Sequence, residues 1–147
     1  MPNSRAFNHA GHLAMQELLT GADVRAMLVM SSSSVFSETD NALTSLAAFS
    51  ALDEYDGTSY ARIALSSEGV TKQDGNGRTI FTSSAISFGT IGAGSREAIG
   101  VLLYVHVDGT AANDYPLSAI AFPAPVAGDG GAFVVNCPSM GWLQLAI

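Results

Sequence analysis

The stretch AIGVLLYVHV, residues 98–107, is the longest apolar run of the chain. Side chains at alternate positions of a strand point to opposite faces of its sheet. In this run Val101, Leu103 and Val105 alternate with Leu102 and Tyr104, so both faces are apolar. Strands of this kind lie at the centre of a sheet and are covered on both sides. The run therefore predicts a central strand in a β-rich fold, ended by the turn signal Asp108-Gly109.

The segments around this run also have the period and composition of strands. Further strands are predicted over residues 23–30, 59–65, 69–72, 78–82, 85–88, 116–122, 132–136 and 142–147. Asp74-Gly75-Asn76-Gly77 separates two of them and is a strong hairpin signal, because these residues tolerate positive φ. Together with the central run these are nine candidate segments, from which we expect about eight strands at short spacing, with no alternation of strands and helices. This pattern predicts an all-β fold, an antiparallel β-sandwich of the eight-stranded jelly-roll kind.

The first 20 residues have helical rather than strand periodicity. A helix is predicted over residues 5–20, with Ser4 as its cap and Gly21 as its left-handed end. Its apolar stripe consists of Phe7, Ala10, Leu13, Ala14 and Leu18. We therefore divide the chain into an N-terminal helical segment, residues 1–22, and a single β-sandwich domain, residues 23–147. The sandwich is expected to be complete without the helix, which then contributes more to assembly than to folding.

Two further expectations concern packing. Residues 40–52 return to helical spacing through Leu43, Leu46 and Ala47, which predicts a helix or a helical turn in a long loop. Alternating positions of the clearest strands predict the core. Its expected members are Leu28, Ile63, Val101, Leu103, Val105, Ile120, Val134 and Leu143.

The composition and charge of the chain limit the classes of partner that it is expected to bind. The 147 residues carry a formal net charge of −7, and charged residues make up only 13%. Phosphate binding needs clustered Lys and Arg, so neither nucleic acid nor an anionic membrane surface is an expected partner. No apolar run reaches the roughly 18 residues of a membrane span. The N-terminal residues do not have the pattern of a signal peptide, and the single cysteine, Cys137, excludes an intrachain disulfide. We expect synthesis in a bacterial cytoplasm.

Three segments partly match motifs of binding or catalytic sites. For each of them a structural role is the favoured interpretation. Residues 89–96, GTIGAGSR, precede a strand and lack lysine, so they predict a tight connection rather than a phosphate cradle. Residues 74–77 open like a calcium loop but lack the ligands that should follow. Asp53, Glu54 and Asp56 form the densest acidic cluster, and a solvated loop anchored by Tyr55 is the favoured interpretation over an acid–base pair.

The remaining candidates are single residues. His9 and His12 lack a third zinc ligand, because Gln16 follows on their helix face. His106 is expected to be a hydrogen-bonded, partly buried histidine and Cys137 a buried structural thiol. Trp142 is more typical of a core aromatic than of a sugar-stacking platform. We therefore predict no catalytic, metal-binding or cofactor-binding residue, no cofactor and no enzyme activity.

Several short sequence motifs follow one another along the chain in a set order. They are residues 52–57 (LDEYDG), 60–62 (YAR), 76–81 (NGRTIF), 92–96 (GAGSR), 100–104 (GVLLY), 116–122 (PLSAIAF) and 141–145 (GWLQL). In this order they resemble small virion structural proteins of tailed bacteriophages, and in particular the jelly-roll cement, or decoration, proteins of their capsids. The resemblance covers about residues 24–147.

The resemblance implies a role without catalysis. A cement protein binds the outside of the head and stabilises contacts between subunits of the major capsid protein, which would be the partner here. It implies a location on the capsid surface of the virion, and we expect self-association as a dimer. The N-terminal helix would then dock on its own sandwich, on a second copy or on the capsid.

Two alternatives belong to other classes. The first is a minor virion component or a carbohydrate- or host-binding module, such as a head fibre or tail tip. Its stacking surface would come from Trp142, Tyr55, Tyr60, Tyr104 and Tyr115. The second is an enzyme that uses Asp53, Glu54 and Asp56 with His106.

Overall fold

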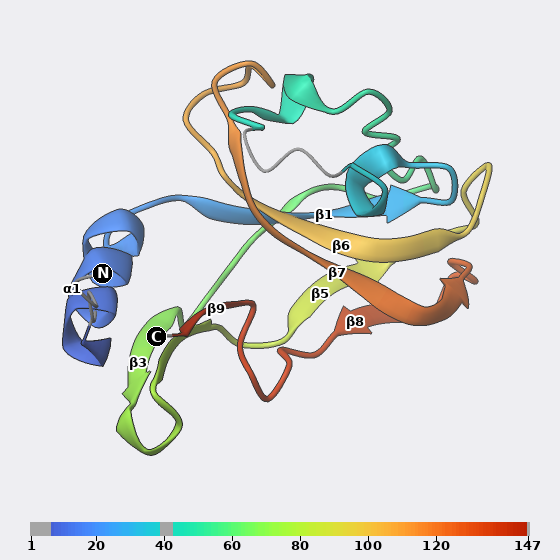
Figure 1. The fold of residues 1–147 in the computed structure, drawn as a ribbon. Coiled ribbons are helices and arrows are strands. Elements are labelled where there is room, and N and C mark those ends of the chain that lie inside the picture. The colour runs from blue at the N-terminus through green and yellow to red at the C-terminus, as the bar shows by residue number, and fades with distance from the viewer. Residues whose placement is uncertain (1–6, 39–42, 147) are drawn as a thin grey trace.

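The computed structural model describes residues 7–38 and 43–146, which form one α-helix and nine strands (Figure 1). The helix is α1 (Asn8–Leu19). The strands are β1 (Val24–Met30), β2 (Ile63–Ala64), β3 (Gly69–Gln73), β4 (Arg78–Thr82), β5 (Ile86–Thr90), β6 (Ala98–Val105), β7 (Tyr115–Val126), β8 (Ala132–Val135) and β9 (Leu143–Ala146). The prediction of a β-rich chain with an N-terminal helix is confirmed, but the described strands number nine rather than about eight.

The strands form three sheets, and every strand pair is antiparallel. The four-stranded sheet has the order β2-β1-β6-β7, the three-stranded sheet β3-β4-β9, and the two-stranded sheet β5-β8. Strand β6 lies between β1 and β7, as its apolar run predicted. All of its residues are buried except Ile99, which is half-buried.

Apolar side chains on the two faces of β1 and β6 belong to two separate clusters. Leu28 and Leu103 lie in the larger cluster, together with Phe88 of β5 and Phe81 of β4. The opposite face forms a smaller cluster, in which Met27, Val29, Leu102 and Tyr104 pack against Leu46 and its neighbours in the loop after β1. This loop therefore gives the central strands the second cover that a run apolar on both faces requires.

The predicted core is confirmed at four positions and wrong at one. Leu28, Val101, Leu103 and Val105 are buried, and three further members are half-buried against the larger cluster: Ile63, Ile120 and Leu143. Val134 is 49% exposed instead. Its neighbours Phe133 and Val135 pack against the core. Because β8 is apolar at four successive positions, its sequence fits either phase of burial.

Local turn signals predicted the connections well. Strands β3 and β4 form a hairpin with Gln73 opposite Arg78, closed by the 3-10 turn η3 (Asp74–Asn76) and by Gly77 at φ +61°. Gly21, at φ +75°, follows α1 in the left-handed region, as expected. Two further 3-10 turns, η1 (Ser34–Phe36) and η2 (Leu46–Ala48), lie between β1 and β2. The turn η2 shows that a helical turn in a long loop was the correct alternative for residues 43–52. The predicted cap Ser4 and residues 40–42 lie outside the described residues.

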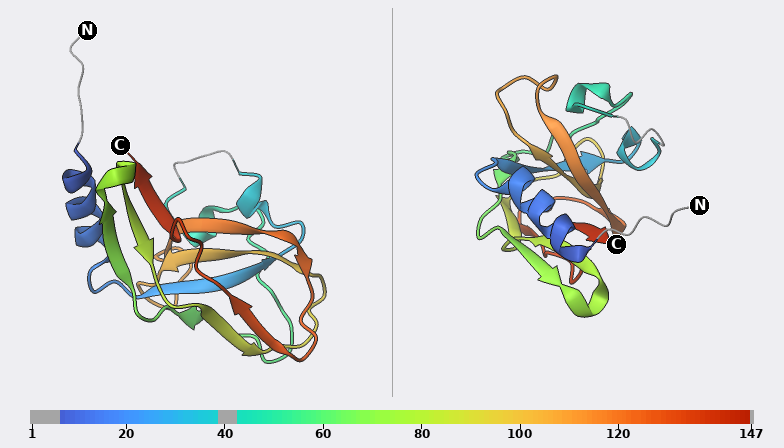
Figure 2. Two further views of the ribbon diagram at one scale, coloured as in Figure 1. Left: turned by 90° about the horizontal axis from the view of Figure 1, so that it is seen from below. Right: turned by 60° about the vertical axis from the view of Figure 1, so that its left-hand side comes forward.

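Helix α1 packs on the three-stranded sheet, but with a different face from the predicted one (Figure 2). Its buried residues are Gly11, Met15 and Leu19, of which Met15 and Leu19 belong to the larger core cluster. The predicted stripe is exposed, with Leu13 at 51% and Leu18 at 47%. The helix is apolar over more than one side, so its periodicity is compatible with more than one buried face. The expectation that the core is complete without the helix is therefore wrong.

Polar contacts fix the position of the first turn of α1. The Asn8 side chain donates a hydrogen bond to Asp74 Oδ1 at 3.0 Å and accepts one from the Thr79 hydroxyl at 3.1 Å. Both partners belong to the β3–β4 hairpin, so this contact ties the start of the helix to the sheet beneath it. Among the described residues no helix is long and apolar enough to span a membrane.

Candidate functional site

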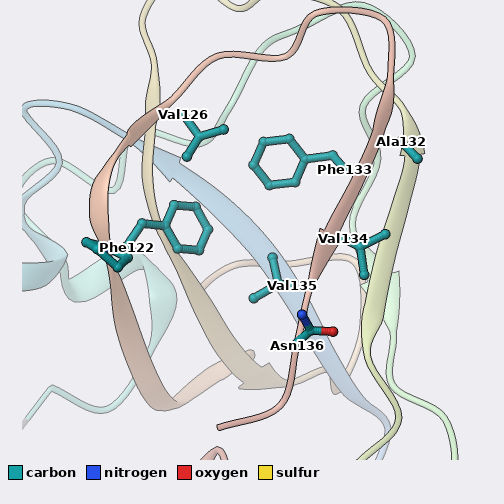
Figure 3. A pocket seen from close by; sticks show the side chains of 8 residues that line it. Phe122, Val126, Ala132, Phe133, Val134, Val135 and Asn136 are labelled. Atoms are coloured by element: carbon teal, nitrogen blue, oxygen red, sulfur yellow. The ribbon is translucent and has the colours of Figure 1, made fainter.

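An apolar groove lies between β7 and β8 (Figure 3). Each of these strands is an edge of its sheet, β7 in the four-stranded sheet and β8 in the two-stranded sheet. The groove has a volume of about 360 Å³. Its lining consists of Phe122, Pro123, Val126, Ala132, Phe133, Val134, Val135 and Asn136. Figure 3 shows Phe122 and Val126 directed from β7, and Phe133 and Val135 from β8, into the space between the strands.

Prolines account for the shape of the β7 wall. Val126 pairs with Ala98 of β6 and Ala121 with Gly100, so residues 122–125 have no counterparts in the ladder. This stretch contains Pro123 and Pro125, which have no N–H to donate. Both prolines therefore lie in an edge strand at a register shift, where a missing donor leaves no ladder bond unmade.

The floor of the groove is held by aromatic packing. The rings of Phe122 and Phe133 lie 6.2 Å apart, and Phe133 meets the buried Phe88 of β5 edge-on, also at 6.2 Å. None of the lining residues is charged, and only Asn136 has a polar side chain. A groove of this composition is suited to apolar side chains, and its lining contains no acidic, basic or nucleophilic side chain.

Tyr55 holds the loop at the rim of this groove. Its side chain is buried, and its hydroxyl donates to the Gly92 carbonyl at 2.8 Å. The same hydroxyl accepts from the amides of Gly94 at 2.9 Å and Gly128 at 3.0 Å. Gly128 belongs to the connection between β7 and β8, so one side chain joins three loops and positions that connection. The prediction that Tyr55 anchors its loop is confirmed, whereas its partners were not predicted.

Each carboxylate of the acidic cluster has its own bonding partner. Asp53 bonds to Arg96, Glu54 forms a two-point ion pair with Arg62 at 2.9 Å, and Asp56 accepts from the Ser95 amide at 2.7 Å. The three carboxylates thus turn to separate partners and do not converge. The interpretation as a solvated loop is incomplete, since these bonds tie the loop to the residues before β6 and β2.

His106 has a partner that the sequence analysis missed. Its Nδ1 lies 3.0 Å from Asp114 Oδ2, and Asp114 is buried. Asp114 Oδ1 also accepts from the amides of Val107 at 2.8 Å and Asp108 at 3.4 Å. Burial alone would raise the pKa of Asp114, but these amides and His106 together hold it below the ordinary value. The sequence did contain a signal for this contact. Asp114 follows a strand that ends in Asp108-Gly109, and an aspartate near such a turn often accepts hydrogen bonds from the turn amides.

We expect Asp114→Asn to destabilise the protein by about 2 kcal/mol near neutral pH, because it removes a buried ionised acceptor. A carboxyl with a lowered folded-state pKa stabilises the fold above its unfolded value of 3.8, and this contribution is lost as the pH falls through the lower folded value. The difference in unfolding free energy between wild type and variant should therefore shrink below about pH 4. Urea unfolding across pH 3–7 measures it. Glu97→Gln is the control, because this exposed carboxylate has no hydrogen bond among the described residues. A difference that does not change with pH would contradict the assignment.

The remaining candidate residues, which are His9, His12 and Cys137, do not come together in one site. The rings of His9 and His12 stack with centroids 6.4 Å apart. Cys137 is half-buried, and its thiol lies 3.6 Å from the Pro138 carbonyl. Within residues 7–38 and 43–146 no group of three or more His, Cys, Asp or Glu is placed to hold a metal ion.

The aromatic residues suggested for sugar stacking are mostly inside the protein. Trp142 is 2% exposed and donates from Nε1 to the Ser83 hydroxyl at 2.8 Å, which confirms the interpretation as a core aromatic. Tyr55 and Tyr104 are buried, and Tyr60 and Tyr115 are half-buried. These rings do not form a shared exposed platform.

No protein-family model, curated protein or solved structure matches the chain. Two apolar surfaces of the described residues are candidates for binding a partner. They are the groove between β7 and β8 and the exposed apolar side of α1.

Proposed function

We propose that this chain is a bacteriophage capsid cement protein, which binds the outside of the head and stabilises contacts between major capsid protein subunits. The observation that carries the proposal is the uncharged apolar groove between two strand edges. The ordered motifs that resemble virion structural proteins support it. In this proposal the partner is the major capsid protein and the location is the capsid surface of the virion.

The groove suits a protein partner better than a reacting substrate. The centres of protein interfaces are apolar and poor in charge, as this lining is. The outer edge of β8 can add a strand from a partner, and the groove then receives apolar side chains of that strand. On β7 the prolines remove donors, which leaves β8 as the edge for pairing.

The same proposal includes the finer architecture. We infer that the four-stranded and two-stranded sheets form the two layers of an antiparallel sandwich. In support, Leu28 and Leu103 of the first sheet share a core cluster with Ile86 and Phe88 of the second. The jelly-roll strand order stays a prediction. A layered scaffold of this kind provides a rigid groove, as a stapling role requires.

Binding to heads that lack this chain tests the proposal. We expect the purified protein to cosediment with such heads, and Val126→Asp to weaken binding at least about tenfold, since it places a charge in the groove. Met140→Asp is the matched control, because Met140 is a similarly exposed apolar residue that does not line the groove. Circular dichroism checks that both variants fold.

Virions provide the second measurement. A cement protein is present in many copies on the capsid, so quantitative mass spectrometry of purified particles should find this chain in high copy number. Absence from particles, or equal binding by Val126→Asp and the wild type, would overturn the proposal. A low copy number at a single vertex or at the tail would favour the minor-component alternative.

A further inference from the structure

We infer that the exposed apolar side of α1 and the edge strand β9 form an interface with a second copy of this chain. The surface consists of Ala10, Ala14 and Leu18 on α1 and Leu143 and Leu145 on β9, and we call it the α1–β9 surface. An apolar cavity of about 220 Å³ lies within it, between Ala14 and Leu18 on one side and Leu143 and Leu145 on the other.

The two sides of α1 differ in chemistry. On the side toward β3, Gln16 and Leu19 border a second hollow together with Glu68 and Val70. The side toward β9 carries Ala14 and Leu18, which face only leucines and Gln144 across the cavity. Packing on its own sheet thus buries Met15 and Leu19 but leaves Leu18 at 47% and Leu145 at 41% exposure. The apolar side of the helix therefore lies beside β9, which is one of the two edge strands of this sheet.

Strand β9 supplies an open edge directly beside this helix. Within the described chain β9 pairs only with β4, so its outer row of backbone groups has no strand partner. Leu145 lies opposite Thr79, whose hydroxyl bonds to Asn8 of α1. Side chains of directly paired residues share a face, so Leu145 lies on the same face as the helix. The open edge and the apolar helix side are therefore contiguous.

A second copy is complementary to this arrangement by symmetry. Two β9 edges pair antiparallel about a twofold axis perpendicular to the sheet, which makes an isologous contact. This operation joins two three-stranded sheets edge to edge and keeps both α1 helices on one face. Each helix turns its apolar side toward β9, so the two apolar sides meet across the axis.

Charge favours the same occupant. Copies of a chain with net charge −7 repel each other unless they meet through an uncharged face. No residue of the α1–β9 surface is charged, and Glu17 is the only ionisable acid of α1. Edge strands that avoid pairing usually carry charges or prolines, and β9, with the sequence LQLA, has neither. The inference does not depend on the proposed function, since it concerns the isolated protein.

Sedimentation of the full chain over a concentration series tests the inference. We expect a dimer whose dissociation constant rises at least about tenfold in Leu18→Glu and in Leu145→Glu. Both side chains are exposed, so circular dichroism should show both variants folded. Val126→Glu is the matched control, because it places the same charge on a similarly exposed apolar residue in the other groove, and its dimer should match the wild type.

Hydrogen exchange provides a second readout that does not need a variant. Amides of β9 on its outer edge should exchange more slowly as the protein concentration rises. A monomer at every concentration would overturn the inference, even if the surface became protected on binding to heads, since the occupant would then be the capsid. A dimer lost in Val126→Glu but kept in Leu18→Glu would also overturn it, because the groove would then be the interface.

Discussion

Tyr55→Phe should lower the free energy of unfolding by about 3–5 kcal/mol, although it removes only one oxygen atom. In the wild type that oxygen serves the Gly92 carbonyl and the amides of Gly94 and Gly128. A buried backbone group that loses its partner costs about 1–3 kcal/mol, and here three groups lose the same partner. Against a typical total of about 5–15 kcal/mol, this is a large fraction of the stability of a small domain.

Water is a poor replacement for this hydroxyl. Tyr55 is 2% exposed, and the loops close around it. A β-carbon at Gly128 would lie 2.7 Å from the Tyr55 hydroxyl, which shows how closely the backbone approaches. The space left by one oxygen above a phenyl ring is smaller than a water site needs. The three backbone groups would therefore remain unpaired or the loops would separate.

Chemical unfolding of Tyr55→Phe beside Tyr115→Phe measures this effect. Tyr115 is half-buried, and its hydroxyl has no hydrogen bond among the described residues, so its loss should change stability by less than about 1 kcal/mol. Faster hydrogen exchange at Gly94 and Gly128 should accompany the loss at Tyr55. Equal stability of the two variants would show that the three loops are held by other contacts.

The positions of the strands could be predicted from local sequence patterns, whereas the face that each element buries could not. The run at residues 98–107 predicted a central strand because apolar residues on both faces leave few alternatives. In α1, by contrast, Met15 and Leu18 are equally apolar, and only the sheet beneath decides which one is buried. The same holds for Val134 beside Phe133, where a shift by one residue exchanges the faces. Periodicity thus identifies an element more surely than its contact face.

The candidate site depends on residues that are far apart in the sequence. Tyr55 bonds to Gly92, Gly94 and Gly128, which lie 37, 39 and 73 positions away. No local pattern connects these positions, so the sequence predicted an anchor without its partners. The groove has a different origin, because its lining lies within residues 122–136, on two consecutive strands that belong to different sheets. Its walls could be predicted as consecutive strands, but not as edges of separate sheets with a space between them.

Leu103→Ala should destabilise the protein by about 2–5 kcal/mol, which tests the centre of the fold directly. Leu103 is fully buried on β6, between Ala26 of β1 and Ser118 of β7. Its small neighbours in the ladder cannot extend to fill the space, so truncation should leave a cavity in the larger core cluster.

The matched control is Val107→Ala, two residues beyond the end of β6. Val107 is 58% exposed, so its truncation removes little buried surface and should change stability by no more than about 0.5 kcal/mol. Urea unfolding of both variants with the wild type gives the comparison, and equal slopes would show that the denatured states are alike. If Leu103→Ala were as stable as Val107→Ala, then β6 would not be the central strand and the order β1-β6-β7 would have to be abandoned.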